Sequence, residues 1–255
     1  MIMKITFLGT GTSTGVPQLG CKCEVCHSED VYDKRLRSSI MVESQNKRVL
    51  VDCTPDFRTQ MLNQTFQKID ALFLTHEHYD HVGGIDDLRP YSQHFGEIDI
   101  YAEENVMHAL NSRIAYCFKE NKYVGLPNIK LHEINIESHI NIGSINITPI
   151  RVMHHKLPIV GYRINNTAYI TDIKTLPESE YHKLQNLDVF IVSALRKTPH
   201  ISHQTLEEAI ALSNLIKPKK TFFTHMSHEI GFHNQISKEL PKNMYLAHDT
   251  LELTI

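Results

Sequence analysis

The hydrophobic positions form short apolar runs separated by polar turns and longer amphipathic segments, a pattern that predicts both strands and helices. In the first half of the chain, the apolar runs predict strands at 4–8, 38–42, 48–51, 71–74 and 98–102. In the second half, they predict strands at 145–152, 161–164, 168–170, 189–192 and 221–223. Helices are expected at 55–65, shortly after Gly83-Gly84, at 103–118 and at 204–216.

The order of these elements indicates an α/β architecture. Each half has strands followed by helices, so we expect two packed β-sheets with helices on the outside. For the helix at 55–65, Thr54 is the expected N-cap and Pro55 the first helical residue. No linker, low-complexity segment or short repeat interrupts the chain, so residues 1–255 are expected to form a single domain.

Composition and charge narrow the function classes. Hydrophobic residues make up 41% and charged residues 22%, which excludes disorder as the general state. The net charge of −3 lacks the basic excess of proteins that bind duplex nucleic acid, but it allows a small anionic substrate. No apolar run approaches the roughly 20 residues that span a bilayer. Residues 1–9 predict a first strand and no signal peptide, so a cytoplasmic location without membrane contact is expected.

The 17 histidines are the unusual feature of the composition, and their spacing points to metal chemistry. Directly after the apolar run 71–74 come His76, His78, Asp80 and His81, all residues that ligate metals. His76 and His78 can converge on one ion, while Asp80 and His81 turn toward a second. Imidazole and carboxylate ligands suit Zn, Mn or Fe. Asp52, after another strand, is either an acceptor that orients a ligand or a turn or helix-capping residue.

This HxHxDH stretch resembles the signature of the metallo-β-lactamase superfamily, whose fold is an αββα sandwich of two mixed β-sheets with outer helices. The resemblance implies three further metal ligands, each after a predicted strand: a His at 154, an Asp at 172 and a His at 225. His155 is the alternative to His154, because neighbours on an extended segment face opposite ways. By resemblance, one metal is held by His76, His78 and His154, and the other by Asp80, His81 and His225, with Asp172 bridging.

A second group of metal-ligand type lies near the N-terminus, where Cys21, Cys23 and Cys26 follow a Gly-Thr-Gly-Thr-Ser turn. Three thiols alone are incomplete for a structural zinc, which takes four ligands, and they could also be reduced surface thiols. Together with the turn, they resemble the branch that contains the phosphoribosyl cyclic phosphodiesterases of phosphonate breakdown. That resemblance implies a structural zinc with His228 as the fourth ligand. Cys53 and Cys117 are expected to pack in the core.

The resemblance implies a metal-dependent hydrolase that cleaves small, possibly cyclic, phosphodiesters with a hydroxide shared by two divalent ions, Zn or Mn. By similarity to the branch, His203 would be a general acid or a phosphate contact, and His200 is the second choice. Asp80 would serve this chemistry as a metal ligand. A homodimer is expected from the resemblance only. Candidates for substrate phosphate contacts are Arg35, Arg37, Arg89 and Lys156.

Two alternatives stay open. One is a tRNA 3′-processing endonuclease, which would need a basic surface such as that of Lys217, Lys219 and Lys220. The other is a non-catalytic metal-binding module on the same fold. The segment 108–126 departs from the pattern of the branch and is either a lid or a helix with a loop.

Overall fold

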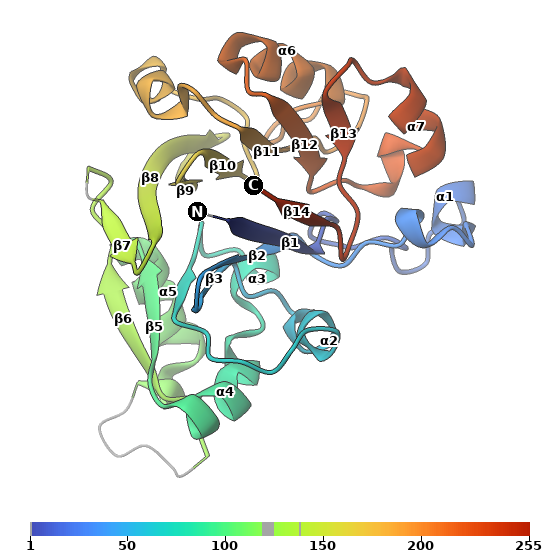
Figure 1. Cartoon of the computed structure of the whole chain (residues 1–255). Helices are drawn as coiled ribbons and strands as arrows, with labels where there is room; N and C mark the ends of the chain where they lie inside the picture. The colour runs from blue at the N-terminus through green and yellow to red at the C-terminus, as the bar shows by residue number, and fades with distance from the viewer. Residues whose placement is uncertain (1, 119–124, 138) are drawn as a thin grey trace.

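Two seven-stranded β-sheets form the centre of the fold, and helices cover their outer faces (Figure 1). The computed structural model of the chain describes residues 2–118, 125–137 and 139–255. The strand order is β14-β1-β2-β3-β4-β5-β6 in the first sheet and β13-β12-β11-β10-β9-β8-β7 in the second. The two sheets, each with its own helices, are the four layers of an αββα sandwich, which confirms the predicted fold class.

The strands of the first sheet are β1 (Met3–Gly9), β2 (Ser39–Ser44), β3 (Lys47–Val51), β4 (Ala71–Phe73), β5 (Ile98–Ala102), β6 (Ile129–Glu133) and β14 (Glu252–Thr254). Strands β14, β1, β2 and β3 pair antiparallel, and β3 to β6 pair parallel.

The strands of the second sheet are β7 (Ile140–Ile142), β8 (Ile145–His154), β9 (Leu157–Ile164), β10 (Thr167–Ile170), β11 (Val189–Ser193), β12 (Lys220–Thr224) and β13 (Met244–Leu246). Strands β7 to β10 form an antiparallel meander, and β10 to β13 pair parallel. The carboxyl ends of parallel strands meet at one edge of a sheet, so the residues after β10 and β12 are brought together there.

The α-helices are α1 (Glu24–His27), α2 (Phe57–Leu62), α3 (Tyr79–Val82), α4 (Arg89–Phe95), α5 (Glu104–Arg113), α6 (Leu206–Ile216) and α7 (His233–Glu239). Short 3-10 helices occur at η1 (Val31–Asp33), η2 (Ile85–Leu88), η3 (Ala115–Cys117), η4 (Glu178–Leu184) and η5 (His228–Ile230). In the described ranges, no helix has the length and apolar character needed to cross a membrane.

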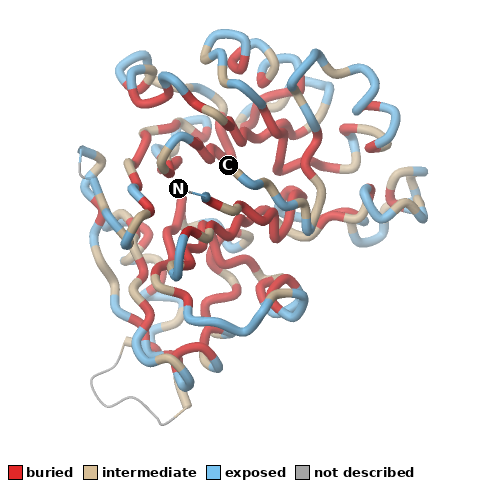
Figure 2. The backbone as a smooth tube through the Cα atoms, viewed as in Figure 1, coloured by how far each residue is buried: buried red, intermediate tan, exposed pale blue. Residues whose placement is uncertain are grey.

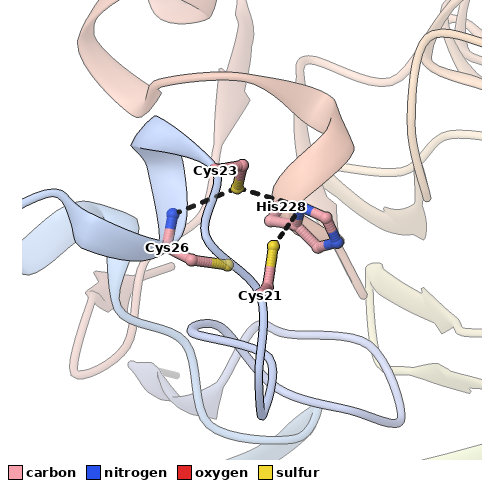
Figure 3. A group of neighbouring side chains, drawn as sticks. All are labelled: Cys21, Cys23, Cys26 and His228. Carbon is pink, nitrogen blue, oxygen red and sulfur yellow. Dashed lines mark hydrogen bonds between the residues drawn. The ribbon is translucent and has the colours of Figure 1, made fainter.

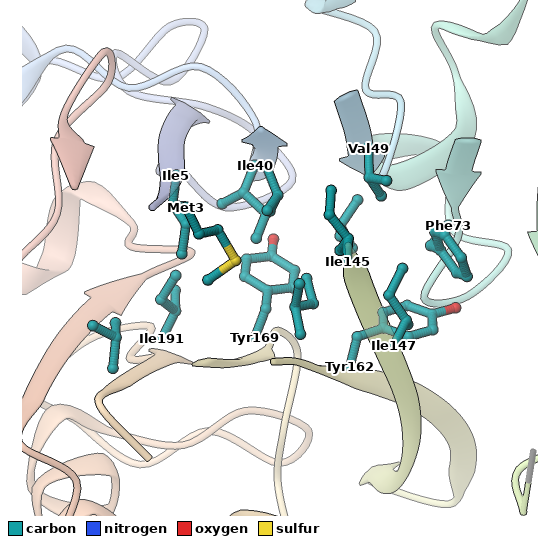
Figure 4. Close-up of a cluster of buried hydrophobic side chains, with 14 of the residues drawn as sticks. Met3, Ile5, Ile40, Val49, Phe73, Ile145, Ile147, Tyr162, Tyr169 and Ile191 are labelled. Carbon is teal, nitrogen blue, oxygen red and sulfur yellow. The ribbon is translucent and has the colours of Figure 1, made fainter. Parts of the chain in front are cut away.

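Three apolar clusters fill the spaces between the layers. The central strands are buried along most of their length, whereas exposed residues concentrate in the outer segments (Figure 2). The central one lies between the two sheets, where Phe73 of β4 packs against Tyr162 of β9 at a ring distance of 5.4 Å (Figure 4). A second joins the first sheet to its helices and includes Cys53 and Cys117, both fully buried as predicted. The third lies between the second sheet and α6 and α7.

The predicted strands are all present, but the short edge strands β6, β7, β13 and β14 escaped prediction. Their exposed or mixed burial leaves little apolar pattern to detect. Strand β9 begins four residues earlier than predicted, because Pro158 disguises its start although it pairs with Met153.

Two helix predictions need correction. The helix predicted at 55–65 begins only at Phe57, because the Thr54 hydroxyl accepts a hydrogen bond from the backbone N–H of Asp56 in a tight turn, instead of capping the helix. The helix predicted at 103–118 ends at Arg113, where Ile114 leaves the helical conformation (φ −125°, ψ 42°). The rest of the segment 108–126 includes the turn η3, and 119–124 lies outside the described residues.

Candidate metal centre

The candidate site lies at the edge of the sandwich where several strands end. Asp52 follows β3, Asp172 follows β10 and His225 follows β12, and all three adopt the left-handed backbone conformation, with φ of 66°, 53° and 55°. This region is uncommon for residues other than glycine, although Asp, Asn and His enter it more often than most, and such conformations concentrate at functional sites. Each strand therefore ends in a sharp turn that aims one side chain along the edge.

A first group of ligand atoms comes from His76, His78 and His154, which lie within 4.8 Å of one another. His76 Nε2 and His78 Nδ1 are 3.0 Å apart. His154 Nδ1 lies 2.9 Å from the carbonyl oxygens of both Asp172 and Ser202. Because carbonyls only accept hydrogen bonds, this nitrogen carries the proton, and Nε2 keeps a free lone pair. The structure thus turns His154 toward the site, whereas His155 is exposed.

A second group consists of Asp80, His81 and His225. Asp80 and His81 lie on α3 and His225 on the opposite sheet, so the group spans the gap between the two halves of the sandwich. His81 Nε2 is 3.1 Å from Asp80 Oδ2, and His225 Nε2 is 3.6 Å from the same oxygen. The seven predicted ligand positions therefore converge on one edge.

Asp172 lies between the two groups. Its Oδ2 atom is 3.2 Å from both His81 Nε2 and His225 Nε2, and it also falls within one cluster with His76 and His81. Despite these short distances, neither of the two nitrogens forms a hydrogen bond of good geometry with any described residue. Ligands around one tetrahedral ion lie roughly 3.4 Å apart at metal–nitrogen bonds of about 2.1 Å. Buried, unpartnered nitrogens at this spacing fit a divalent metal.

Asp52, which is fully buried, orients ligands of both groups. Its carboxylate accepts hydrogen bonds from His81 Nδ1 at 2.7 Å, from the Thr75 backbone N–H at 2.9 Å and from the Thr75 hydroxyl at 3.0 Å. The Thr75 oxygen in turn lies 3.0 Å from His76 Nδ1, which donates to it. One buried carboxylate thus sets the tautomer of His81 directly and of His76 through Thr75, leaving both Nε2 atoms to face the site. The geometry favours the ligand-orienting role over the turn role.

Burial and charge shift the pKa values of the site's histidines in opposite directions. Burial alone would lower the pKa of His81, but the Asp80 and Asp52 carboxylates raise it well above its usual value, so the ring holds a second proton on Nε2 that a bound cation would replace. Burial lowers the pKa of His76 well below its usual value, so this ring is neutral, the form that binds metal. Burial also opposes ionisation of Asp172, yet the neighbouring His225 and His81 hold its pKa well below the usual range. The site is therefore electrostatically prepared for cations.

His203 is buried and sits beside this group. Its Nδ1 is 3.5 Å from Asp172 Oδ1, and its ring centre is 4.6 Å from that of His154. Burial lowers the pKa of His203 to about 3, so the ring is neutral at physiological pH. His200 lies farther out, where its Nδ1 accepts from the Ser202 backbone N–H. Both belong to the loop before α6, and His203 is the one that reaches the metal ligands.

The candidate phosphate contacts are largely occupied elsewhere. Arg35 is buried and donates to the Thr10 hydroxyl and the Ala247 carbonyl, which excludes it as a substrate contact. Arg37 pairs with Asp56, and Arg89 pairs with Asp86. Lys156, one of the four candidates, is exposed in the turn between β8, which ends at His154, and β9.

The four predicted structural ligands Cys21, Cys23, Cys26 and His228 come together, with their ligand atoms within 4.8 Å of one another (Figure 3). His228 Nδ1 lies 3.2 Å from the Cys23 sulfur and 3.8 Å from the Cys21 sulfur. Partial burial alone would raise the pKa of Cys23, but hydrogen bonds from the Cys26 backbone and neighbouring side chains lower it to about 6. Burial raises the pKa of Cys26, in the same set, to about 11. A set of three sulfurs and one nitrogen is typical of structural zinc.

Comparison with known proteins agrees with this geometry. Residues 47–226 match the family described as "Beta-lactamase superfamily domain". The chain belongs to the metallo-β-lactamase superfamily. It is also 38% identical to a solved structure described as a new diphosphatase from the PhnP family, with a TM-score of 0.93 over 100% of this chain and 98% of that chain. This places it in the PhnP family.

Two curated relatives have names other than diphosphatase. The octanoyltransferase of Porphyromonas gingivalis is 41% identical over 99% of this chain but only 52% of its own length. The ribonuclease Z of Prochlorococcus marinus is 27% identical over 68% of this chain and 53% of its own length. The chain thus spans about half the length of these relatives. As a member of the superfamily, it has the fold of a metal-dependent hydrolase.

Proposed function

We propose that this chain is a dinuclear metal hydrolase that cleaves small linear or cyclic phosphodiesters. The observation that carries the proposal is the position of Asp172: its carboxylate shares one cluster of ligand atoms with His76 and His81, one residue from each group, and its Oδ2 lies 3.2 Å from both His81 Nε2 and His225 Nε2. A carboxylate shared in this way suits two adjacent ions better than one.

The ligand atoms divide between the two ions as follows. His76, His78 and His154 would hold one, Asp80, His81 and His225 would hold the other, and Asp172 would bridge them. Zn and Mn both suit such a set of imidazoles and carboxylates. Bound ions would lower the pKa of a shared water and offset charge on phosphoryl oxygens.

The protein's own residues contribute orientation and proton placement. Asp52 and Thr75 keep the protons of His81 and His76 on Nδ1. His203, with its ring beside His154 and Asp172, is assigned to the substrate, where it would contact a phosphoryl oxygen or the leaving oxygen. A phosphodiester fits because it brings a non-bridging oxygen to the cations. Its leaving group is an alkoxide, which needs a proton donor nearby.

A structural zinc at Cys21, Cys23, Cys26 and His228 belongs to the same proposal. His228 lies three residues after His225, so this zinc would tie the N-terminal loop to the strand end that carries an active-site ligand. Its role is to hold the rim of the site.

The names of the relatives define the substrates to compare. A PhnP-family relative is described as a diphosphatase, and a diphosphate with esterified ends also has phosphorus between two bridging oxygens. The ribonuclease Z relative makes tRNA processing the second candidate, but the net charge of −3 and the Lys219–Asp188 ion pair speak against a basic tRNA surface. The name octanoyltransferase belongs to a protein of about twice this length.

The test is a substrate panel with purified protein and Zn or Mn: bis(p-nitrophenyl) phosphate, cyclic ribose phosphates, esterified diphosphates, acyl thioesters and a β-lactam. Hydrolysis of the phosphate substrates alone is expected, and Asp172→Ala should abolish it. Asp188→Ala, an acidic residue that pairs with Lys219 away from the site, is the matched control and should keep full activity. Thioester or β-lactam hydrolysis without phosphodiesterase activity would overturn the proposal.

A further inference from the structure

A buried polar network lies behind the candidate site and connects four separate parts of the chain. At its centre is Thr10, which is fully buried. Its hydroxyl accepts a hydrogen bond from Arg35 Nη1 at 2.8 Å and donates one to Asp249 Oδ1 at 2.7 Å. A guanidinium on one side and a carboxylate on the other fix both the position and the direction of this hydroxyl.

The two charged partners of Thr10 are themselves held tightly. Arg35 also donates to the Ala247 carbonyl at 2.8 Å and to His233 Nδ1 at 3.1 Å. The second oxygen of Asp249 accepts from the Leu36 backbone N–H at 2.7 Å. The network therefore joins the segments that contain Thr10, Arg35, His233 and Asp249, which restrains Thr10 from several directions.

The backbone of Thr10 reaches the active-site strand end. Its carbonyl accepts from the Met226 N–H at 2.9 Å, and the Met226 carbonyl accepts from the Thr12 N–H at 3.0 Å. Met226 directly follows His225, the residue with a left-handed φ of 55°. These two hydrogen bonds grip the chain just after the strained turn. On the other side, the Thr224 carbonyl accepts from the Ala194 N–H at 2.9 Å.

We infer that Thr10 is a positioning residue for His225, and that its hydroxyl, held between Arg35 and Asp249, keeps the His225 turn in the conformation that presents the imidazole to Asp172. Histidine enters the left-handed region more often than most residues other than glycine but is still uncommon there, so the turn depends on the hydrogen bonds that flank it. The inference rests on the proposed role of His225 as a metal ligand. The effect of the Thr10 hydroxyl on the backbone conformation of the His225 turn can be tested without that role.

The test compares Thr10→Val, which keeps the shape of the side chain and removes its hydroxyl, with Thr10→Ser, which restores the hydroxyl. The matched control is Thr167→Val, another fully buried threonine, whose hydroxyl makes no hydrogen bond with a described residue. Two readouts are taken: amide hydrogen exchange of the peptide containing Met226 in chelator-treated protein, and the affinity for Co²⁺ followed by visible absorption.

Thr10→Val is expected to speed exchange at Met226 and to weaken Co²⁺ binding at the site proposed for Asp80, His81 and His225 by about tenfold or more, the scale found when residues that orient ligands are removed. Thr10→Ser should lie near the wild type in both readouts, and Thr167→Val should match it. Unchanged exchange and unchanged Co²⁺ affinity in Thr10→Val would overturn the inference, whatever happens to its stability.

If Thr10→Val does not fold, Arg35→Lys is the second variant, because it keeps the buried charge but loses the forked geometry. Faster exchange at Met226 supports the inference, and unchanged exchange contradicts it. If the wild type takes up no Co²⁺ outside the cysteine site, the proposed function fails, while the exchange readout still decides the role of Thr10.

Discussion

The substitution Asp52→Asn tests how the fold sets the tautomers of the proposed metal ligands. Asp52 has no solvent exposure, and its left-handed conformation (φ 66°) is tolerated by Asn as well as by Asp. The change therefore leaves shape and backbone intact and alters only hydrogen-bond polarity. One carboxylate oxygen becomes an amide that donates.

The consequence follows from the three donors that face Asp52. If the remaining oxygen stays on the Thr75 backbone N–H, the new amide faces His81 Nδ1 and donates to it. The His81 proton then moves to Nε2, the atom that lies 3.2 Å from Asp172 and would bind metal. If the amide is flipped, it meets the Thr75 N–H, and a buried donor loses its acceptor at a cost of about 1–3 kcal/mol.

We expect Asp52→Asn to weaken active-site metal binding and to lower kcat by about 10–100-fold, the usual effect of losing a residue that orients a metal ligand. Metal content after dialysis and kcat on the best phosphodiester are the measurements. Asp70→Asn is the control. The Asp70 side chain is also nearly buried and accepts a hydrogen bond from the Arg48 backbone N–H. Arg48 lies near the start of β3, at the opposite end from Asp52 and the site. Wild-type metal affinity and kcat in Asp52→Asn would refute the tautomer argument.

The remaining predictions concern the zinc clip, the core and pH. Cys23→Ser should remove one metal per chain and lower the unfolding free energy by about 2–3 kcal/mol, as expected for a site saturated about a hundredfold; calorimetry and metal analysis test this, and Cys53→Ala should leave the metal count unchanged. Tyr162→Phe removes the hydrogen bond to the Leu74 carbonyl and should cost about 1 kcal/mol in urea unfolding; an unchanged midpoint would contradict it. Burial raises the pKa of Asp249 to about 6, so its contribution to stability is present below about pH 4 and lost as pH rises through 6. The wild type should thus lose about 2–3 kcal/mol relative to Asp249→Asn between pH 4 and pH 7, and a constant difference would count against that shift.

Much of the site could be predicted from the sequence, because its ligands follow buried strands. Apolar runs such as 71–74 mark where a strand ends, and His76 follows this run after one residue, Thr75. The choice between His154 and His155 could not be made from the sequence. It depends on the left-handed turn at His155 and on the carbonyls of Asp172 and Ser202, contributed by other loops.

The supporting residues were harder to foresee. Arg35 was a candidate for phosphate binding because a lone arginine carries no sign of burial in its sequence context. Its partners Thr10, Ala247 and His233 come from both ends of the chain, so the contact depends on tertiary structure alone. The hydrogen-bonded relay from Asp52 through Thr75 to His76 has one indication in the sequence, the Thr directly before the first ligand. The HxHxDH signature does not include this Thr.

The most direct test of the central claim is a crystal structure of the protein loaded with Mn²⁺ or Zn²⁺, with metals located by anomalous scattering. The account predicts two ions about 3.5–4 Å apart that share Asp172, and a third ion among Cys21, Cys23, Cys26 and His228. A single ion at the strand ends, or none, with Asp172 in contact with protein atoms only, would contradict it.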